Sequence, residues 1–253
     1  MIEEPYRWVE AIANRREYIE TQLASGSPII ALGYADGILL FTVGRQKLFE
    51  IYDRIALGAI GHPGDIERLR MAAIELASSE GFTRSAADVS LRRLAYYSLS
   101  PVMKNAFEQI YGAPFLARLL FAEIGATPED DLFLRVDYDG AISVSQVKNK
   151  NSRFAVLSGS KAAAEQMEEF LRHEHGDGEE LSTALQLALD AWTLGQSGAT
   201  ERNEIPSREQ IRALRAERQG DVTIEAAVLD RKTGSTVRYR PLRETELANL
   251  TTA

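Results

Sequence analysis

The 253-residue chain contains no cysteine and only three histidines, His62, His173 and His175. Without cysteine there are no disulfide bonds, no thiolate catalysis and no cysteine-ligated metal sites. Three scattered histidines also make a histidine-based zinc site a poor interpretation. We therefore predict neither a metal site nor a cofactor.

Basic charge and long apolar runs are also scarce. The chain has 29 Lys and Arg against 37 Asp and Glu, a net charge of −8, which argues against nucleic-acid binding because phosphate contacts need a basic surface. No run approaches the roughly 18 apolar residues of a membrane span, and the polar segment MIEEPYRWVE does not resemble a signal peptide. We expect a cytoplasmic protein with no nucleic-acid or membrane partner.

An apolar content of 45% at this length is enough for a core, and we predict one domain over residues 1–253. Its first helix covers residues 8–24, where Trp8, Ile12 and Ile19 form an apolar stripe. That stripe could pack on its own domain or on a second copy of the chain. Residues 195–219 are polar and predict a solvated connector. Its arginines are spaced for one helical face: Arg208, Arg212, Arg215 and Arg218.

Residues 26–61 form the most apolar part of the chain. Strands are predicted at 28–34 and 38–43, joined by an Asp36-Gly37 turn, and a second pair at 47–52 and 55–60. Lys47 would then share a strand face with Phe49 and Ile51, where an unpaired charge is costly. Three interpretations of Lys47 remain open: a snorkelling side chain, an anion site, or a lysine that tunes an amine.

The rest of the chain alternates between helical and strand periodicity. His62-Pro63-Gly64-Asp65 predicts a helix start with Gly81 as its C-cap, and a second helix begins near Ser85 and bends at Pro101. Further strands and helices follow at 114–124, 131–138, 141–147, 154–158, 161–173, 178–194, 222–229, 235–240 and 242–250. Paired helices between runs of strands indicate two sheets face to face with a helix layer outside each.

Motifs that carry chemistry are few. Gly159-Ser160-Lys161 lacks the upstream glycine of a phosphate-binding loop, so we interpret it as a helix N-terminus. His173 and His175 do not have metalloprotease spacing, and we expect both to be exposed. His62 precedes a Pro-Gly turn and is expected to cap the helix that follows.

Several segments resemble the proteasome core-particle superfamily: GSPIIALGYADGILL, QKLFEIYDRIALGAIG, LFLRVDYDGAISV and VTIEAAVLDRKTGSTVRYRPL. Within it, IALGAIGHPGDIERLRMAAIELA and EGFTRSAADV are most similar to the α-type subunit of bacterial proteasomes. The resemblance covers about residues 8–245. It implies an α+β fold, the four-layer αββα sandwich of N-terminal-nucleophile hydrolases, with an N-terminal helix.

The resemblance places the catalytic positions of the superfamily on Ser27, Val43 and Lys47. Active subunits need a mature N-terminal nucleophile, an acid and a lysine. Val43 cannot supply a carboxylate, and Ser27 follows 26 residues that include the predicted helix. We therefore expect no catalytic residues. The alternative is an N-terminal-nucleophile peptidase activated by cleavage before Ser27.

The resemblance also implies binding roles. Lys47, Gly61 and His62 would form a pocket for the C-terminal tail of a hexameric ATPase activator, and residues 1–7 would be a gating arm. The gate residues are Met1, Ile2, Glu3, Glu4 and Pro5. The expected protein is a noncatalytic α-ring subunit in a homoheptameric ring. It would admit unfolded protein substrates to a ring of catalytic β-type subunits. A diverged member that assembles but has lost its ATPase partner is a third possibility.

Overall fold

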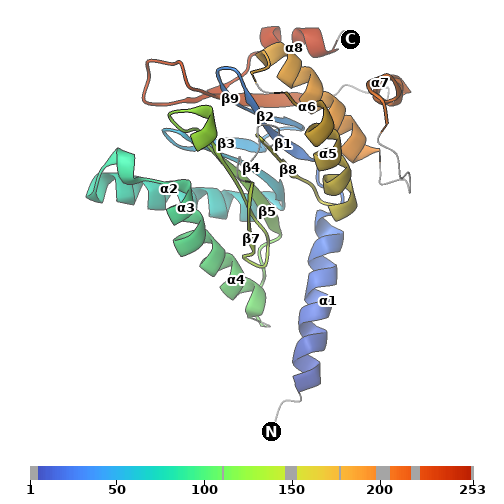
Figure 1. Cartoon of the computed structure of the whole chain (residues 1–253). Coiled ribbons are helices and arrows are strands. Elements are labelled where there is room, and N and C mark those ends of the chain that lie inside the picture. Colours follow the sequence, from blue (N-terminus) through green and yellow to red (C-terminus); the bar gives the residue numbers. More distant parts are fainter. Residues whose placement is uncertain are drawn as a thin grey trace.

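Two five-stranded antiparallel sheets face each other in the computed structural model, which describes residues 5–109, 111–145, 153–176, 178–197, 206–217 and 223–251 (Figure 1). The first sheet has the order β10-β9-β2-β1-β8, and the second has the order β3-β4-β5-β6-β7. Their bounds are β1 Ile29–Tyr34, β2 Gly37–Val43, β3 Leu48–Tyr52, β4 Ile55–Gly61, β5 Ala117–Glu123, β6 Leu132–Val136, β7 Ile142–Ser145, β8 Phe154–Leu157, β9 Ile224–Asp230 and β10 Tyr239–Pro241.

Helices cover the outer face of each sheet. One apolar cluster joins the first sheet to α5 and α6, a second joins the other sheet to α2, α3 and α4, and a third lies between the sheets. This arrangement confirms the predicted αββα sandwich. The helix bounds are α1 Pro5–Leu23, α2 Pro63–Thr83, α3 Leu91–Leu94, α4 Ser100–Glu108, α5 Lys161–Glu174, α6 Leu181–Gln196, α7 Arg208–Glu217 and α8 Glu244–Thr251.

The strands are buried more completely than their alternating pattern suggests. In β6, Leu134 belongs to the cluster under the α2 layer and Phe133 to the cluster between the sheets, and both are fully buried. Both faces of this strand are therefore buried. The physical reason is that a sheet inside a four-layer sandwich is covered on both faces.

The region after β4 differs from prediction in two places. Gly81 is not the C-cap of α2, which continues to Thr83 and is capped at Arg84. A Cβ at Gly81 would lie 2.1 Å from the Tyr52 hydroxyl, so the glycine permits close packing inside the helix. The predicted second helix is divided into a 3₁₀ turn at Ala86–Asp88, α3, a π-helical turn at Ala95–Leu99, and α4. Pro101 lies in the first turn of α4, where its missing amide is tolerated.

Helix α1 projects from one end of the sandwich, with the N-terminal end of the chain at its tip (Figure 1). Ile19 and Leu23 in its last turns are buried against Phe107 and Tyr138. Near the tip Trp8 is 50% exposed. The helix therefore packs on its own domain through Ile12, Ile19 and Leu23, whereas Trp8 is half exposed.

The predicted solvated connector contains a packed helix. Ile211 of α7 is fully buried in the cluster around α6. Arg215 lies 3.7 Å from Asp190 of α6, and Arg208 lies 2.6 Å from Glu174 of α5. The expectation of free, solvated arginines is wrong for these two side chains because carboxylates of the adjacent helices face them. Arg218 lies outside the described residues.

Candidate binding site at the Lys47 loop

Ser27 lies between the end of α1 and the start of β1, and its hydroxyl is fully engaged. Ser27 Oγ donates to the Val43 carbonyl oxygen at 2.7 Å and accepts from Trp192 Nε1 at 2.9 Å. A serine nucleophile needs a base that takes its proton. Here the proton is directed at a backbone carbonyl, which is not a base. The arrangement holds the end of β2 and helix α6 against the start of β1.

The connection between β2 and β3, residues 44–47, is called here the Lys47 loop. Two of its residues have positive φ, Gly44 at +139° and Gln46 at +57°. Lys47 precedes β3 rather than lying within it, and the pairing of β3 with β4 is irregular between Glu50 and Tyr52. The predicted strand 47–52 therefore begins one residue later, at Leu48. Lys47 is a loop residue at the edge of the sheet.

Backbone hydrogen bonds hold both ends of this loop. Gly44 N donates to the Thr223 carbonyl at 2.8 Å, and Ala59 N donates to the Lys47 carbonyl at 3.0 Å. Glu225 of β9 accepts from two successive amides, Lys47 N at 3.0 Å and Leu48 N at 3.1 Å. The loop is thus fixed to both sheets.

The Lys47 side chain is half-buried. Burial lowers the pKa of its ammonium below the ordinary value of 10.5, and the nearby Glu225 carboxylate partly opposes that shift. Among the residues that the structure describes, Lys47 forms no ion pair with a carboxylate. A half-buried cation without an ionic partner is costly, and a carboxylate ligand would relieve that cost.

Gly61 lies near Lys47 at the same edge of the second sheet. Lys47 accepts from Ala59 of β4, and Gly61 follows two residues later along that strand. Gly61 has φ of +132°, and a Cβ there would lie 2.0 Å from the Leu116 carbonyl oxygen. Only glycine fits, because both the dihedral angle and the close approach exclude a side chain.

His62 caps α2, as predicted. Its Nδ1 accepts from Gly64 N at 3.2 Å, and the residue is exposed. One ring nitrogen is therefore engaged with its own helix. Of the three predicted pocket residues, the structure brings Lys47 and Gly61 to one edge and gives His62 a capping role beside them.

The predicted gate is largely outside the described part of the chain. Met1, Ile2, Glu3 and Glu4 lie outside the described residues, and Pro5 is the first residue of α1. The gate assignment stays a prediction.

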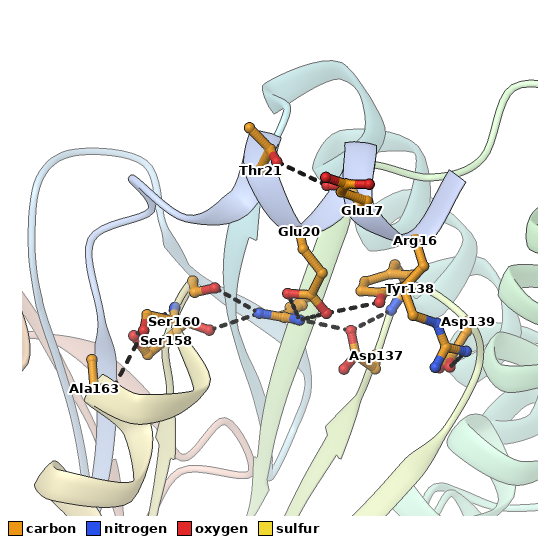
Figure 2. Close-up of polar contacts among 12 residues, drawn as sticks. Arg16, Glu17, Glu20, Thr21, Asp137, Tyr138, Asp139, Ser158, Ser160 and Ala163 are labelled. Atoms are coloured by element: carbon orange, nitrogen blue, oxygen red, sulfur yellow. Dashed lines mark hydrogen bonds and ion pairs between the residues drawn. The ribbon is translucent and has the colours of Figure 1, made fainter. Parts of the chain in front are cut away.

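A second polar site was not predicted from the sequence. Arg118 of β5 donates through one terminal nitrogen to both oxygens of Glu20 at 2.7 Å, and through Nε to Asp137 Oδ1 at 2.9 Å. Its other terminal nitrogen donates to the Ser158 and Gly159 carbonyls. Tyr138 also donates to Glu20, at 2.8 Å, and Figure 2 shows these acids and the tyrosine converging below α1.

These four side chains, Arg118, Glu20, Asp137 and Tyr138, are called here the Arg118 network. Arg118 is buried, and the network ties α1 to β5 and to the turn after β6. One signal was available: an arginine in the otherwise apolar run FLARLLFA. A buried arginine needs carboxylate partners, although the sequence does not say which ones.

The remaining motifs have structural roles. Ser160 caps α5, with Ala163 N donating to its Oγ at 3.4 Å, so Gly159-Ser160-Lys161 is a helix N-terminus as predicted. His173 is exposed, as predicted. His175 is not exposed: it is buried, with Nε2 2.8 Å from the Gly33 carbonyl oxygen. Its place after the end of α5 turns it inward toward β1.

Over the described part of the chain, no group of three or more potential metal-ligating side chains occurs. No described helix has the length and apolar character needed to cross a lipid bilayer.

Comparison with known proteins identifies the family. The chain is 35% identical over 231 residues to the proteasome subunit alpha of Streptomyces scabiei, covering 88% of this chain and 81% of that protein. It is 31% identical over 234 residues to the proteasome subunit alpha of a Parafrankia species, covering 88% and 85%. The proteasome subunit alpha of Streptomyces griseus is 34% identical over 250 residues, covering 95% and 81%. No protein-family model matches the chain. With identity above 30% across most of both chains, this chain belongs to the proteasome α-subunit family.

Proposed function

We propose that this chain is a noncatalytic subunit of the α ring of a bacterial proteasome core particle. Its relatives carry the name proteasome subunit alpha. The state of Ser27 supports the noncatalytic role, because its hydroxyl donates to a carbonyl and accepts from Trp192. Val43, at the position of the catalytic acid, has no ionisable group.

The ring would be a homoheptamer that stacks on catalytic β-type subunits. A ring of identical subunits uses a heterologous interface, in which one face of each copy contacts a different face of the next. The exposed apolar side chains of α1 support a role for this helix in contacts with other subunits. They are Trp8, Val9 and Tyr18.

The ring would also control entry to the proteolytic chamber. Residues 1–7 would be a gating arm that admits unfolded protein substrates, with the gate formed by Met1, Ile2, Glu3, Glu4 and Pro5. The whole chain would act in the cytoplasm as one domain.

The Lys47 loop would bind the C-terminal carboxylate of an ATPase activator, with Gly61 and His62 at the same edge. One observation carries this proposal: the Lys47 ammonium is half-buried on a loop fixed by hydrogen bonds, with no ionic partner in the described residues. One charge-assisted hydrogen bond contributes about 1.5–3 kcal/mol. Tight binding would therefore need several tails of a hexamer to bind at once.

Lys47→Ala tests this role in a core particle assembled with its β-type partner. We expect assembly to be retained, as seen by native mass spectrometry, and ATPase-stimulated degradation of an unfolded substrate to be lost. Lys161→Ala is the matched control, because Lys161 is an exposed lysine paired only with Glu165 at 3.8 Å. Unchanged stimulation in Lys47→Ala would contradict the docking role.

The noncatalytic role has its own test. Intact-mass measurement of the assembled α ring should show a chain that retains α1. A chain that begins at Ser27 would contradict the proposal and support the peptidase alternative.

A further inference from the structure

We propose that Glu225 is a positioning residue for Lys47: its carboxylate binds the backbone of the Lys47 loop and so leaves the Lys47 ammonium available to an incoming carboxylate. This inference rests on the proposed docking function. Glu225 lies 178 positions further along the sequence, on the strand next to β2, and its register partner there is Thr42.

The hydrogen-bond geometry suits a carboxylate better than an amide. Glu225 Oε2 lies 3.0 Å from Lys47 N, and Oε1 lies 3.1 Å from Leu48 N. Two acceptor oxygens facing two donors suit an ionised carboxylate, which only accepts. A glutamine of the same shape would keep one acceptor oxygen at the Oε1 position, 3.1 Å from Leu48 N and 3.3 Å from Lys47 N, and would lose the 3.0 Å hydrogen bond from Lys47 N to Oε2.

The loop needs this restraint because its backbone is strained. Gln46 is the only non-glycine residue with positive φ in the described part of the chain, at +57°. Such a conformation is unfavourable for a residue with a side chain and persists only where surrounding contacts determine it. The next two residues, Lys47 and Leu48, donate their backbone amides to Glu225. Glu225 therefore offsets the strain at Gln46 and fixes the direction in which Lys47 leaves the backbone.

Gly44 leaves room for the Lys47 side chain. A Cβ at Gly44 would lie 2.9 Å from Lys47 Cε, so the aliphatic part of Lys47 lies over the bare glycine backbone. The side chain thus has a fixed path across the loop. With both Glu225 oxygens directed at amides, no ion pair forms between Glu225 and the Lys47 ammonium within the described structure.

Two carboxylates, Glu225 and Glu50, bear on the electrostatics around Lys47. Glu225 on β9 is the charge that favours the ammonium form and opposes the effect of burial on the Lys47 pKa. Burial raises the pKa of Tyr239 on β10 above its ordinary range, and the charges of Glu225 and Glu50 add to that shift. Glu50 on β3 is thus a neighbouring carboxylate that makes no hydrogen bond to the Lys47 loop, which makes it a matched control.

The test uses the full-length chain labelled with ¹⁵N, so that backbone amide signals are observed, and with its lysines reductively dimethylated with ¹³C, which keeps their charge. The Lys47 signal is identified by its absence in Lys47→Ala, and its pKa is followed by NMR as the pH is raised. Propionate is then titrated as a single-carboxylate probe, with propionamide as the uncharged control. The variants are Glu225→Gln, Glu225→Asp and Glu50→Gln, each checked by circular dichroism.

We expect Glu225→Gln to weaken propionate binding at Lys47 about tenfold, the loss of roughly one oriented contact. The Lys47 pKa of this variant should be lower than in the wild type, because the Glu225 carboxylate no longer opposes the effect of burial. Glu225→Asp should restore part of both properties, and Glu50→Gln should leave the binding unchanged. Propionamide should not bind any of the proteins.

Two results would overturn the inference in distinguishable ways. If Lys47→Ala abolishes the propionate effects on the surrounding backbone signals but folded Glu225→Gln binds like the wild type, Glu225 is not a positioning residue and the docking role stands. If propionate perturbs the backbone of Lys47→Ala as it does the wild type, Lys47 is not the carboxylate site. Both the docking role and the positioning role then fall. A folded Glu225→Gln protein with an unchanged Lys47 pKa and unchanged binding counts against Glu225 alone.

Discussion

Arg118 and Lys47 contact adjacent residues of β4 in the second sheet, but their positive charges have opposite environments. Lys47 accepts from Ala59 of β4, while the next residue, Ile60, pairs with Arg118 on β5. Arg118 contacts two carboxylates and two carbonyls. Lys47 has its backbone amide engaged, and among the described residues its ammonium forms no ion pair. A buried charge with partners on every side is a structural link, whereas a fixed cation without a partner is suited to bind a ligand.

The largest expected effect on stability is at Arg118, whose charge has partners on every side. Arg118→Met should lower the free energy of unfolding by about 3–5 kcal/mol, because it leaves Glu20 and Asp137 without their buried partner. Urea denaturation measures the loss. Arg16→Met, which removes an exposed pair with Asp139, is the control and should cost less than about 1 kcal/mol. Equal costs for the two variants would break the comparison.

Tyr138→Phe should lower the free energy of unfolding by about 1.5–3 kcal/mol at pH 7, since a hydrogen bond to a charged group is lost. Burial, and then the bond to Glu20, raises the Tyr138 pKa above its ordinary value of 10.0. A raised folded pKa gives stability that is complete below pH 10 and is lost as the pH rises through the folded value. The variant should therefore show a weaker decline in stability above pH 10 than the wild type.

The control for this prediction is Tyr111→Phe, because Tyr111 is 98% exposed. Its stability should match the wild type at every pH. An unchanged alkaline decline in Tyr138→Phe would show that Tyr138 does not contribute to it.

Ser27→Ala should lower the free energy of unfolding by about 1–3 kcal/mol, because Trp192 Nε1 and the Val43 carbonyl both lose a partner. Peptide hydrolysis by the assembled core particle should stay at the wild-type rate. A normal assembly that loses peptide hydrolysis would contradict the noncatalytic assignment. Chemical denaturation and a fluorogenic peptide assay separate the two effects.

Lys47→Met should have the smallest effect on stability, within about 0.5 kcal/mol of the wild type. Methionine can follow the same path over Gly44, and no ion pair within the described structure is broken. A thermal melt of the isolated chain measures this. A loss comparable with that of Arg118→Met would mean that Lys47 is a structural residue, and the contrast between the two sites would disappear.

Much of the fold could be predicted because its signals are local. The apolar strands around Asp36-Gly37 and the helix start at His62 depend on neighbouring residues, and both are found where expected. The division of the helical region after Ser85 was missed. There Ser85 Oγ donates to Asp88, and the chain forms a short 3₁₀ turn instead of a continuing helix.

The candidate site was predicted only in part. Lys47 was identified because a charge stood in an apolar run, and Gly61 through a family resemblance. The partners of Lys47 and Arg118 could not be found this way, because Glu225 is 178 positions from Lys47 and Glu20 is 98 positions from Arg118. Such contacts depend on how the two sheets and α1 come together, which no local pattern records.

The attachment of α1 has a mechanical consequence. The helix is held near Glu20 and leaves its first turns exposed. Pro5 lies 15 residues earlier on the same helix, which is about 22 Å at 1.5 Å per residue. A tilt of about 5° at the Arg118 network would therefore move the tip by about 2 Å. Helix α1 is in this sense a lever, and the ion pairs at Glu20, together with the hydrogen bonds from Arg15 to the carbonyls of Ala106, Phe107 and Gly112, set the position of its N-terminal end.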